Sequence, residues 1–179
     1  MKIKNILFFS FLITSQMLAQ SNHIYLGGLG PGLATSINYE RQLSKDGNLF
    51  LRGGYGMFSI ESTSMDLSGN NLGTIKTKLS INPVIIGIHY LKGNNLKLDL
   101  GLGLSYWMIA VEGNGSGALG DFNFGEEGSY ANFYATIGIR YQNPDGGLPF
   151  GLGLSPTQVS VEDETGILPL PHINIGYSF

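Results

Sequence analysis

The sequence lacks cysteine and has little charge, and both shortages narrow what the protein can do. Without cysteine, neither disulfide bonds nor thiolate metal sites can form. Charged residues are 13% of the 179 residues, about half the share usual in soluble domains. The formal net charge of −3 excludes a generally basic surface for binding nucleic acid. Beyond residue 20, no apolar run is long enough for a membrane helix.

The first twenty residues have the layout of an export signal. Lys2 and Lys4 give a positive start, an apolar run follows over 6–13, and the segment becomes small and polar before Gln20. This pattern predicts a secretory signal peptide over 1–19, with cleavage after Ala19 or Gln20, and one mature domain over 20–179. The alternative is an uncleaved anchor helix, but the apolar run is well short of the roughly 20 residues that a span requires.

The rest of the chain alternates with a period of two, which is typical of β-strands. In the clearest case, leucines at even positions from Leu96 to Leu104 oppose Lys97, Asp99 and Gly101 on the other face. The same pattern predicts eight strands, at about 23–30, 33–43, 49–60, 74–91, 96–108, 131–141, 147–155 and 169–179. An even number of strands fits an all-β, antiparallel, up-and-down barrel. A parity switch at Asn82-Pro83 predicts a β-bulge in the fourth strand.

The connections alternate in length. Three are short and rich in Gly, Asn and Asp, at 44–48, 92–95 and 143–146. Three are longer and polar, at 61–73, 112–128 and 156–168. Outer-membrane barrels have short periplasmic turns and long external loops, so this asymmetry predicts which end faces outward. The tight Gly30-Pro31-Gly32 connection is the exception on the external side.

Two features predict that the apolar face meets lipid. The polar face carries many glycines, which suit a crowded barrel interior better than a solvated surface. The outward aromatic residues collect near the predicted periplasmic ends of the strands, as in an interfacial aromatic girdle. We assign five residues to this girdle: Tyr39, Tyr90, Tyr141, Tyr177 and Phe179.

Three segments resemble those of known proteins. The chain ends in HINIGYSF, with alternating apolar residues and a C-terminal aromatic, which resembles the assembly signal of bacterial outer-membrane proteins. SINYERQ (36–42) and INPVIIGIHYLKG (81–93) are similar to segments of small OmpA- and OmpX-like barrels of Gram-negative bacteria. The resemblance implies an eight-stranded transmembrane barrel in the cell outer membrane, in contact with lipid and lipopolysaccharide. It also implies assembly by the barrel-assembly machinery through the last strand, but no settled activity. We expect a monomer.

Charged residues also fall on the predicted inward face. All lie a few residues from a periplasmic turn, so we expect them at similar depth in the barrel. An isolated buried charge costs several kcal/mol, so such groups are expected to pair. The sequence therefore predicts an ion-pair network that plugs the barrel, and a proton or ion gate is the alternative. The predicted members are Glu40, Arg52, His89, Lys97, Asp99 and Arg140.

The three long connections carry only acidic charge, because no Lys or Arg falls within them. The acidic residues in or beside them are Glu61, Asp66, Glu112, Asp121, Glu126, Glu127, Glu162, Asp163 and Glu164. An acidic rim beside anionic lipopolysaccharide favours loose association of Ca²⁺ or Mg²⁺, and a solvated acidic surface is the simpler interpretation. We expect no other cofactor or metal.

Enzymatic motifs are weak. Gly115–Gly120 matches GxGxxG, but no helix follows it to hold a dinucleotide. A lipid A deacylase would place a serine two residues after a lipid-facing histidine, and neither His89 nor His172 fits. We therefore expect a non-enzymatic barrel with a structural or surface-interaction role. A lipid-modifying enzyme and a narrow pore are the alternatives.

Overall fold

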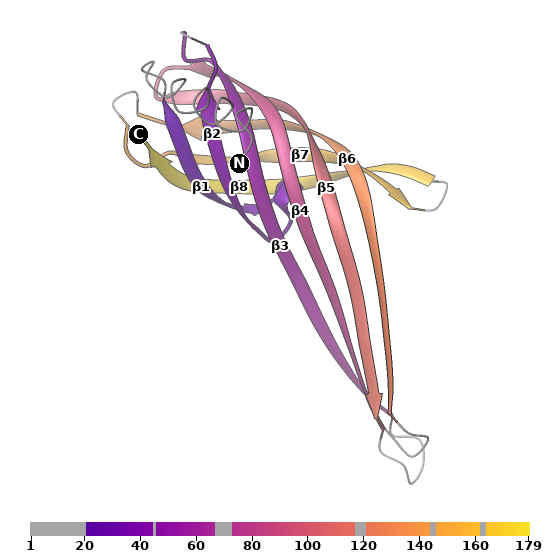
Figure 1. Ribbon diagram of the computed structural model, residues 1–179. Coiled ribbons are helices and arrows are strands. Elements are labelled where there is room, and N and C mark those ends of the chain that lie inside the picture. The colour runs from indigo at the N-terminus through magenta and orange to yellow at the C-terminus, as the bar shows by residue number, and fades with distance from the viewer. Residues whose placement is uncertain (1–20, 45, 67–72, 117–120, 144–145, 162–163) are drawn as a thin grey trace, which may run out of the picture.

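The computed structural model describes residues 21–44, 46–66, 73–116, 121–143, 146–161 and 164–179. The predicted signal peptide lies outside these residues. Eight strands and one 3-10 turn make up the fold (Figure 1). In order they are β1 (Asn22–Leu29), η2 (Gly30–Gly32), β2 (Thr35–Gln42), β3 (Leu49–Asp66), β4 (Gly73–Gly93), β5 (Leu96–Ser116), β6 (Phe122–Tyr141), β7 (Phe150–Val161) and β8 (Glu164–Ser178). Over the described ranges, the structure has no helix with the length and apolar character needed to span a membrane.

The strands form one closed antiparallel barrel in which each pairs with its neighbours in the chain. The ring closes between β1 and β8, where Ile24 pairs with Tyr177 and Leu26 with Ile175. This confirms the predicted fold class. Because every strand has two neighbours, the body of the barrel leaves no open sheet edge.

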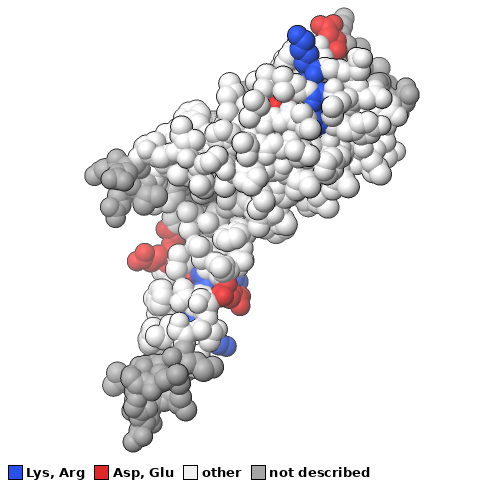
Figure 2. Space-filling model, turned by 180° about the vertical axis from the view of Figure 1, so that it is seen from behind, with Lys and Arg blue, Asp and Glu red and all other residues white. Residues whose placement is uncertain are grey.

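Alternation along the strands sorts side chains into an inner and an outer set. On β5, Leu98, Leu100 and Leu102 point outward and are exposed, whereas Asp99 is buried inside. The buried residues of the molecule are mostly polar, and its exposed ones include many large apolar side chains. Figure 2 shows the consequence on one side of the molecule: the barrel body is almost free of charged side chains, which lie at one end and on a projection at the other. Only a lipid environment suits such an exterior.

Three turns at one end are short, as predicted. Each contains a glycine with positive φ: Gly47 at 71°, Gly93 at 140° and Gly146 at 92°. Side chains with a Cβ rarely adopt this conformation, which explains the glycines in these turns. The N-terminal end of β1 and the C-terminal end of β8 lie at this same end, which the short turns predict to be the periplasmic one.

The three long connections predicted at the other end are wrong. Residues 61–66, 112–116, 122–128, 156–161 and 164–168 continue the strands instead. Strands β3 to β6 are 18 to 21 residues long and project as a four-stranded sheet beyond the barrel (Figure 1). We call this projection the arm. The hairpin of β7 and β8 leaves the barrel in a different direction.

The predicted β-bulge at Asn82-Pro83 is also wrong. Tyr55 pairs with Val84 and Phe58 with Ile81, so the register of β3 and β4 is the same on both sides. The ladder between β4 and β5 continues through Asn82 and Pro83 without an inserted residue. The parity switch in the sequence therefore has another cause, which lies in the arm.

Candidate functional site

Four charged side chains from four strands meet inside the barrel. The Arg52 Nε–H donates to Glu40 Oε1 at 2.8 Å, and Arg140 Nη1–H donates to Glu40 Oε2 at 2.6 Å. Arg140 Nη2–H also donates to Asp99 Oδ2, and Arg52 lies 3.7 Å from the same oxygen. All four side chains are at most 6% exposed. Two carboxylates and two guanidiniums balance in charge, which is what burial of such groups requires.

Two aromatic side chains complete this cluster. His89 Nδ1 lies 2.8 Å from Asp99 Oδ1. The guanidinium carbons of Arg52 and Arg140 lie 5.3 Å and 5.5 Å from the centre of the Tyr25 ring, within the range of a cation–π contact. We call Glu40, Arg52, Asp99, Arg140, His89 and Tyr25 the interior cluster.

The structure thus brings five of the six predicted interior residues together. The sixth, Lys97, lies half-buried on the same face, outside the ion pairs that join the members of the cluster. Sequence reasoning missed Tyr25 and also His23, whose Nδ1 lies 2.6 Å from Ser178 Oγ across the β1–β8 seam. Applying the same alternation to β1 would have found both, because His23 and Tyr25 share its inward face.

Interior glycines make room for large neighbours. The Tyr134 ring lies over Gly103, where an added Cβ would come within 2.6 Å of it, and its hydroxyl lies next to Gly87. His89 similarly occupies the space beside Gly101, where an added Cβ would meet its ring at 2.6 Å. Glycine on this face therefore serves packing within a narrow barrel.

The β1–β2 connection folds into the external mouth of the barrel. Gly30, Pro31 and Gly32 of η2 are buried, and Ser105 Oγ donates a hydrogen bond to the Pro31 carbonyl at 2.9 Å. The Trp107 indole N–H donates to Ser105 Oγ at 2.8 Å. Pro83 fills the space beside Gly56, where an added Cβ would lie 2.7 Å from its ring. The tight external turn of the sequence is thus a cap on the barrel.

The arm reverses the amphipathic pattern of the barrel. Its outer face, continuous with the lipid-facing surface, carries polar rows such as Ser59, Ser80, Ala110 and Glu127 across the four strands. The next row outward is Glu61, Lys78, Glu112 and Gly125. The polar outer face of the arm therefore indicates that it stands in water.

The inner face of the arm, continuous with the barrel interior, is apolar next to the barrel, and a more polar row with Ser62 and Thr77 follows farther out. Its paired rows include Phe58, Ile81, Ile109 and Gly128, and then Ile60, Leu79, Val111 and Glu126. Nearer the tip, the rings of Phe124 and Phe122 lie over Gly113 and Gly115. Ile60 is 55% exposed and Phe122 49%. The parity switch that was interpreted as a bulge is this reversal of the apolar face. The sequence pattern reveals it only in the fourth strand.

The prediction that the acidic residues lie in external loops is also wrong for most of those that the structure describes. Glu61, Glu112, Glu126 and Glu127 lie on strands of the arm, and Lys78 stands between Glu61 and Glu112 in register. Glu162 and Asp163 lie outside the described residues. Among the described residues, no group of three or more His, Asp or Glu side chains is placed to hold a metal ion.

The five residues assigned to the girdle all point outward near the periplasmic end. Tyr39, Tyr90, Tyr141, Tyr177 and Phe179 are 39% to 59% exposed. The rings of Tyr177 and Phe179 stack with centres 6.3 Å apart. Tyr55 and Tyr106 lie at the external edge of the apolar belt, and sequence reasoning missed this second aromatic position.

No family model matches the chain, and no curated protein is similar to it in sequence. Solved structures share its fold. The attachment invasion locus protein Ail of Yersinia pestis, in complex with the heparin analogue sucrose octasulfate, has a TM-score of 0.53 at 11% identity, over 89% of this chain and 97% of Ail. The N-terminal β-barrel domain of Pseudomonas aeruginosa OprF has a TM-score of 0.51 at 14% identity, over 89% and 97%. A major outer membrane protein of Thermus thermophilus has a TM-score of 0.50 at 13% identity, over 90% and 100%.

The chain therefore has the fold of eight-stranded outer-membrane β-barrels, as the resemblance implied. Its apolar belt, closed ring and buried polar interior fit the outer membrane as its location.

Proposed function

We propose that this protein is a surface-interaction barrel, whose body anchors it in the outer membrane and whose arm docks an apolar partner outside the cell. The observation that carries the proposal is the reversed amphipathic pattern of the arm. Residues such as Ile60 and Phe122 leave apolar surface exposed on a segment whose other face is suited to water. Large exposed apolar patches on soluble surfaces mark interaction sites.

The size of this face is sufficient for a specific partner. Four strands about 4.8 Å apart and about eight residues long, at about 3.3 Å per residue, give a face of about 500 Å². Covering it would bury about 1,000 Å² over both partners, the lower bound for specific interfaces. The face has little charge, with Glu126 as its acidic member in the rows described. We therefore infer a partner with an apolar strand or helix face.

Dye binding tests the docking face. The probe is 8-anilinonaphthalene-1-sulfonate, titrated onto the full protein in phospholipid nanodiscs. Replacing Ile60, Leu79 and Ile109 together by serine is expected to abolish most of the fluorescence gain. The matched control, Lys78→Ser with Glu112→Ser, removes one charge of each sign from the outer face and is expected to leave the gain unchanged. Equal fluorescence from all three proteins would contradict the proposal.

We further propose that the barrel is closed to solute flow, rather than acting as a narrow pore. The interior cluster and the buried η2 cap support this, because they occupy the periplasmic half and the external mouth of an eight-stranded barrel. Planar-bilayer recordings of the purified protein are expected to show no persistent single-channel currents. Reproducible unitary steps would favour the pore instead.

A structural rather than enzymatic role completes the proposal. Ser155 Oγ lies 2.9 Å from His172 Nδ1, but Ser155 is 1% exposed and so has no contact with lipid. Lipid A from cells with and without the protein is expected to give the same mass spectrum. A structural role of this kind requires no cofactor. Loss of an acyl chain from lipid A in the presence of the protein would support an enzymatic role.

We also propose that the protein is a monomer. We propose further that the barrel-assembly machinery recognises the last strand through Ile173, Ile175, Tyr177 and Phe179.

A further inference from the structure

The ladder between β6 and β7 is the shortest between neighbouring long strands. Six residue pairs join them, against twenty between β5 and β6. The outermost pair is Tyr134 with Thr157, and the next is Ile137 with Leu154. Pro156 falls in the gap between these pairs, where its missing N–H cannot join the ladder. The β7–β8 hairpin turns away from the arm just beyond this point (Figure 1).

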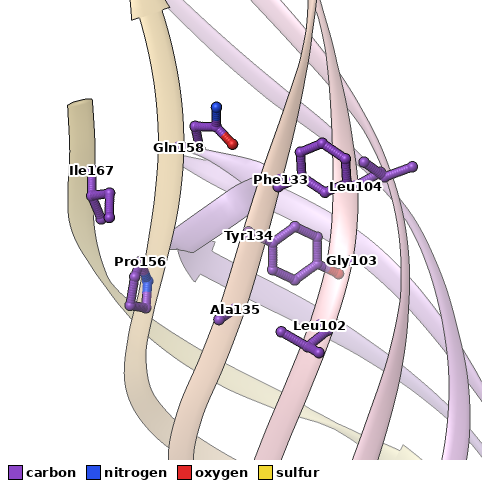
Figure 3. Close-up of a pocket in the computed structure, with 9 residues that line it drawn as sticks. All are labelled: Leu102, Gly103, Leu104, Phe133, Tyr134, Ala135, Pro156, Gln158 and Ile167. Atoms are coloured by element: carbon purple, nitrogen blue, oxygen red, sulfur yellow. The ribbon is translucent and has the colours of Figure 1, made fainter. Parts of the chain in front are cut away.

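A groove of about 540 Å³ lies on the outer surface at this seam. Figure 3 shows its walls, formed by Leu102 and Leu104 of β5, Phe133 and Ala135 of β6, and Pro156 and Ile167 beyond the seam. A small residue helps to create the hollow, since Ala135 stands on the outer face of β6 between the larger Phe133 and Ile137. Gln158 is the polar side chain of the lining.

The depth of the groove indicates what surrounds it. Met108 and Ser129 mark the row where the outer face becomes polar, and Leu102 lies six residues below Met108. Six residues are about 20 Å along a strand, or about 15 Å in depth at the usual tilt of about 40°. This is half of a hydrocarbon core about 30 Å thick, so the groove lies among lipid acyl chains.

A second, polar hollow of about 440 Å³ lies higher on the same strands. Asn82, Glu127 and Ser129 contribute its polar side chains. It stands at the level of the lipid headgroups, and the Tyr106–Ala131 pair separates it from the groove. A carboxylate at this place repels anionic headgroups and favours one that carries an amine.

We propose that the two hollows together bind one zwitterionic, amine-bearing phospholipid. One acyl chain lies in the groove at the β6–β7 seam, and the ammonium group lies beside Glu127. The side chains that carry this proposal, in the groove and at Glu127, lie on the outer face and not on the inner face of the arm, so the variants that test the two proposals differ.

Lipid retention tests this site. The full protein is taken from vesicles of phosphatidylethanolamine, phosphatidylglycerol and lipid A, and its retained lipid is measured by native mass spectrometry. The wild-type protein is expected to retain phosphatidylethanolamine. Ala135→Phe, which fills the groove, is expected to reduce this retention about tenfold, equivalent to about 1.4 kcal/mol. Ile137→Phe, on the same face of β6 but outside the groove, serves as the matched control.

Two further variants keep the test decisive. Leu102→Trp fills the groove from β5 and is expected to act like Ala135→Phe, should the latter fail to fold. Glu127→Gln is expected to remove the preference for phosphatidylethanolamine over phosphatidylglycerol while retention of lipid continues. Retention of lipid A in place of phosphatidylethanolamine, or equal retention by Leu102→Trp and Ile137→Phe, would overturn the proposal.

Discussion

Replacing Glu40 by glutamine is the sharpest test of the interior cluster. The side chain is fully buried, and both of its oxygens accept hydrogen bonds from Arg52 or Arg140. Glutamine has the same size, but whichever way its amide turns, its NH₂ group faces a guanidinium N–H. The change therefore removes the charge and also places two donors against each other. Breaking a buried ion pair by altering one partner costs about 3–5 kcal/mol.

The expected loss can be measured by urea unfolding of the protein in detergent micelles, followed by the fluorescence of Trp107, the single tryptophan. With an m-value of about 2 kcal/mol/M, a loss of about 3 kcal/mol lowers the midpoint by about 1.5 M. Glu61→Gln, on the exposed outer face of the arm, is the control and should stay within about 0.5 kcal/mol. A Glu40→Gln midpoint equal to that of the control would refute the reasoning.

Other predictions follow from packing and from membrane depth. Gly103→Ala should cost about 1–3 kcal/mol because its Cβ would meet the Tyr134 ring, whereas Gly53→Ala, with nothing within 4 Å of the added atom, should be close to neutral in the same urea assay. Leu102→Lys, near mid-depth, should cost about 2–4 kcal/mol, and Met108→Lys at the external edge about 0–1 kcal/mol; equal costs would contradict the assigned membrane position. The unheated protein should migrate differently from the boiled protein in a detergent gel, and identical mobility would count against a closed barrel.

Sequence alternation could predict which side chains face inward, but not which of them meet. Glu40, Asp99 and Arg140 have inward parity within their own strands, and that is a local property. The contact between Glu40 and Arg140 spans 100 residues and joins β2 to β6, which lie on opposite sides of the ring. It depends on the stagger of the closed barrel, which a single sequence does not display.

The sequence predicts loops where the arm stands because the composition of the arm resembles that of loops. Segment 122–129 is rich in Gly, Asn and Glu, and segment 61–66 contains Glu and Asp, all of which are depleted in strands. The alternation is present there, but with apolar residues on the face that is polar in the barrel. A scan for one fixed orientation of the apolar face ends a strand where the orientation changes, as at Met108, or interprets the change as a bulge, as at Asn82-Pro83.

This change of orientation locates the membrane surface. Along β4, the outward side chains run from Tyr90 through Ile86 and Val84 to Asn82, and then to Ser80 and Lys78. The same change occurs on β5 after Met108 and on β6 at Ser129, and the register pairs Asn82 with Met108 and Met108 with Ser129. Three neighbouring strands thus change within one paired row, which places the boundary between lipid and water near this row. Loops would have no reason to keep this register, so the apolar inner face beyond the row belongs to an ordered sheet in water.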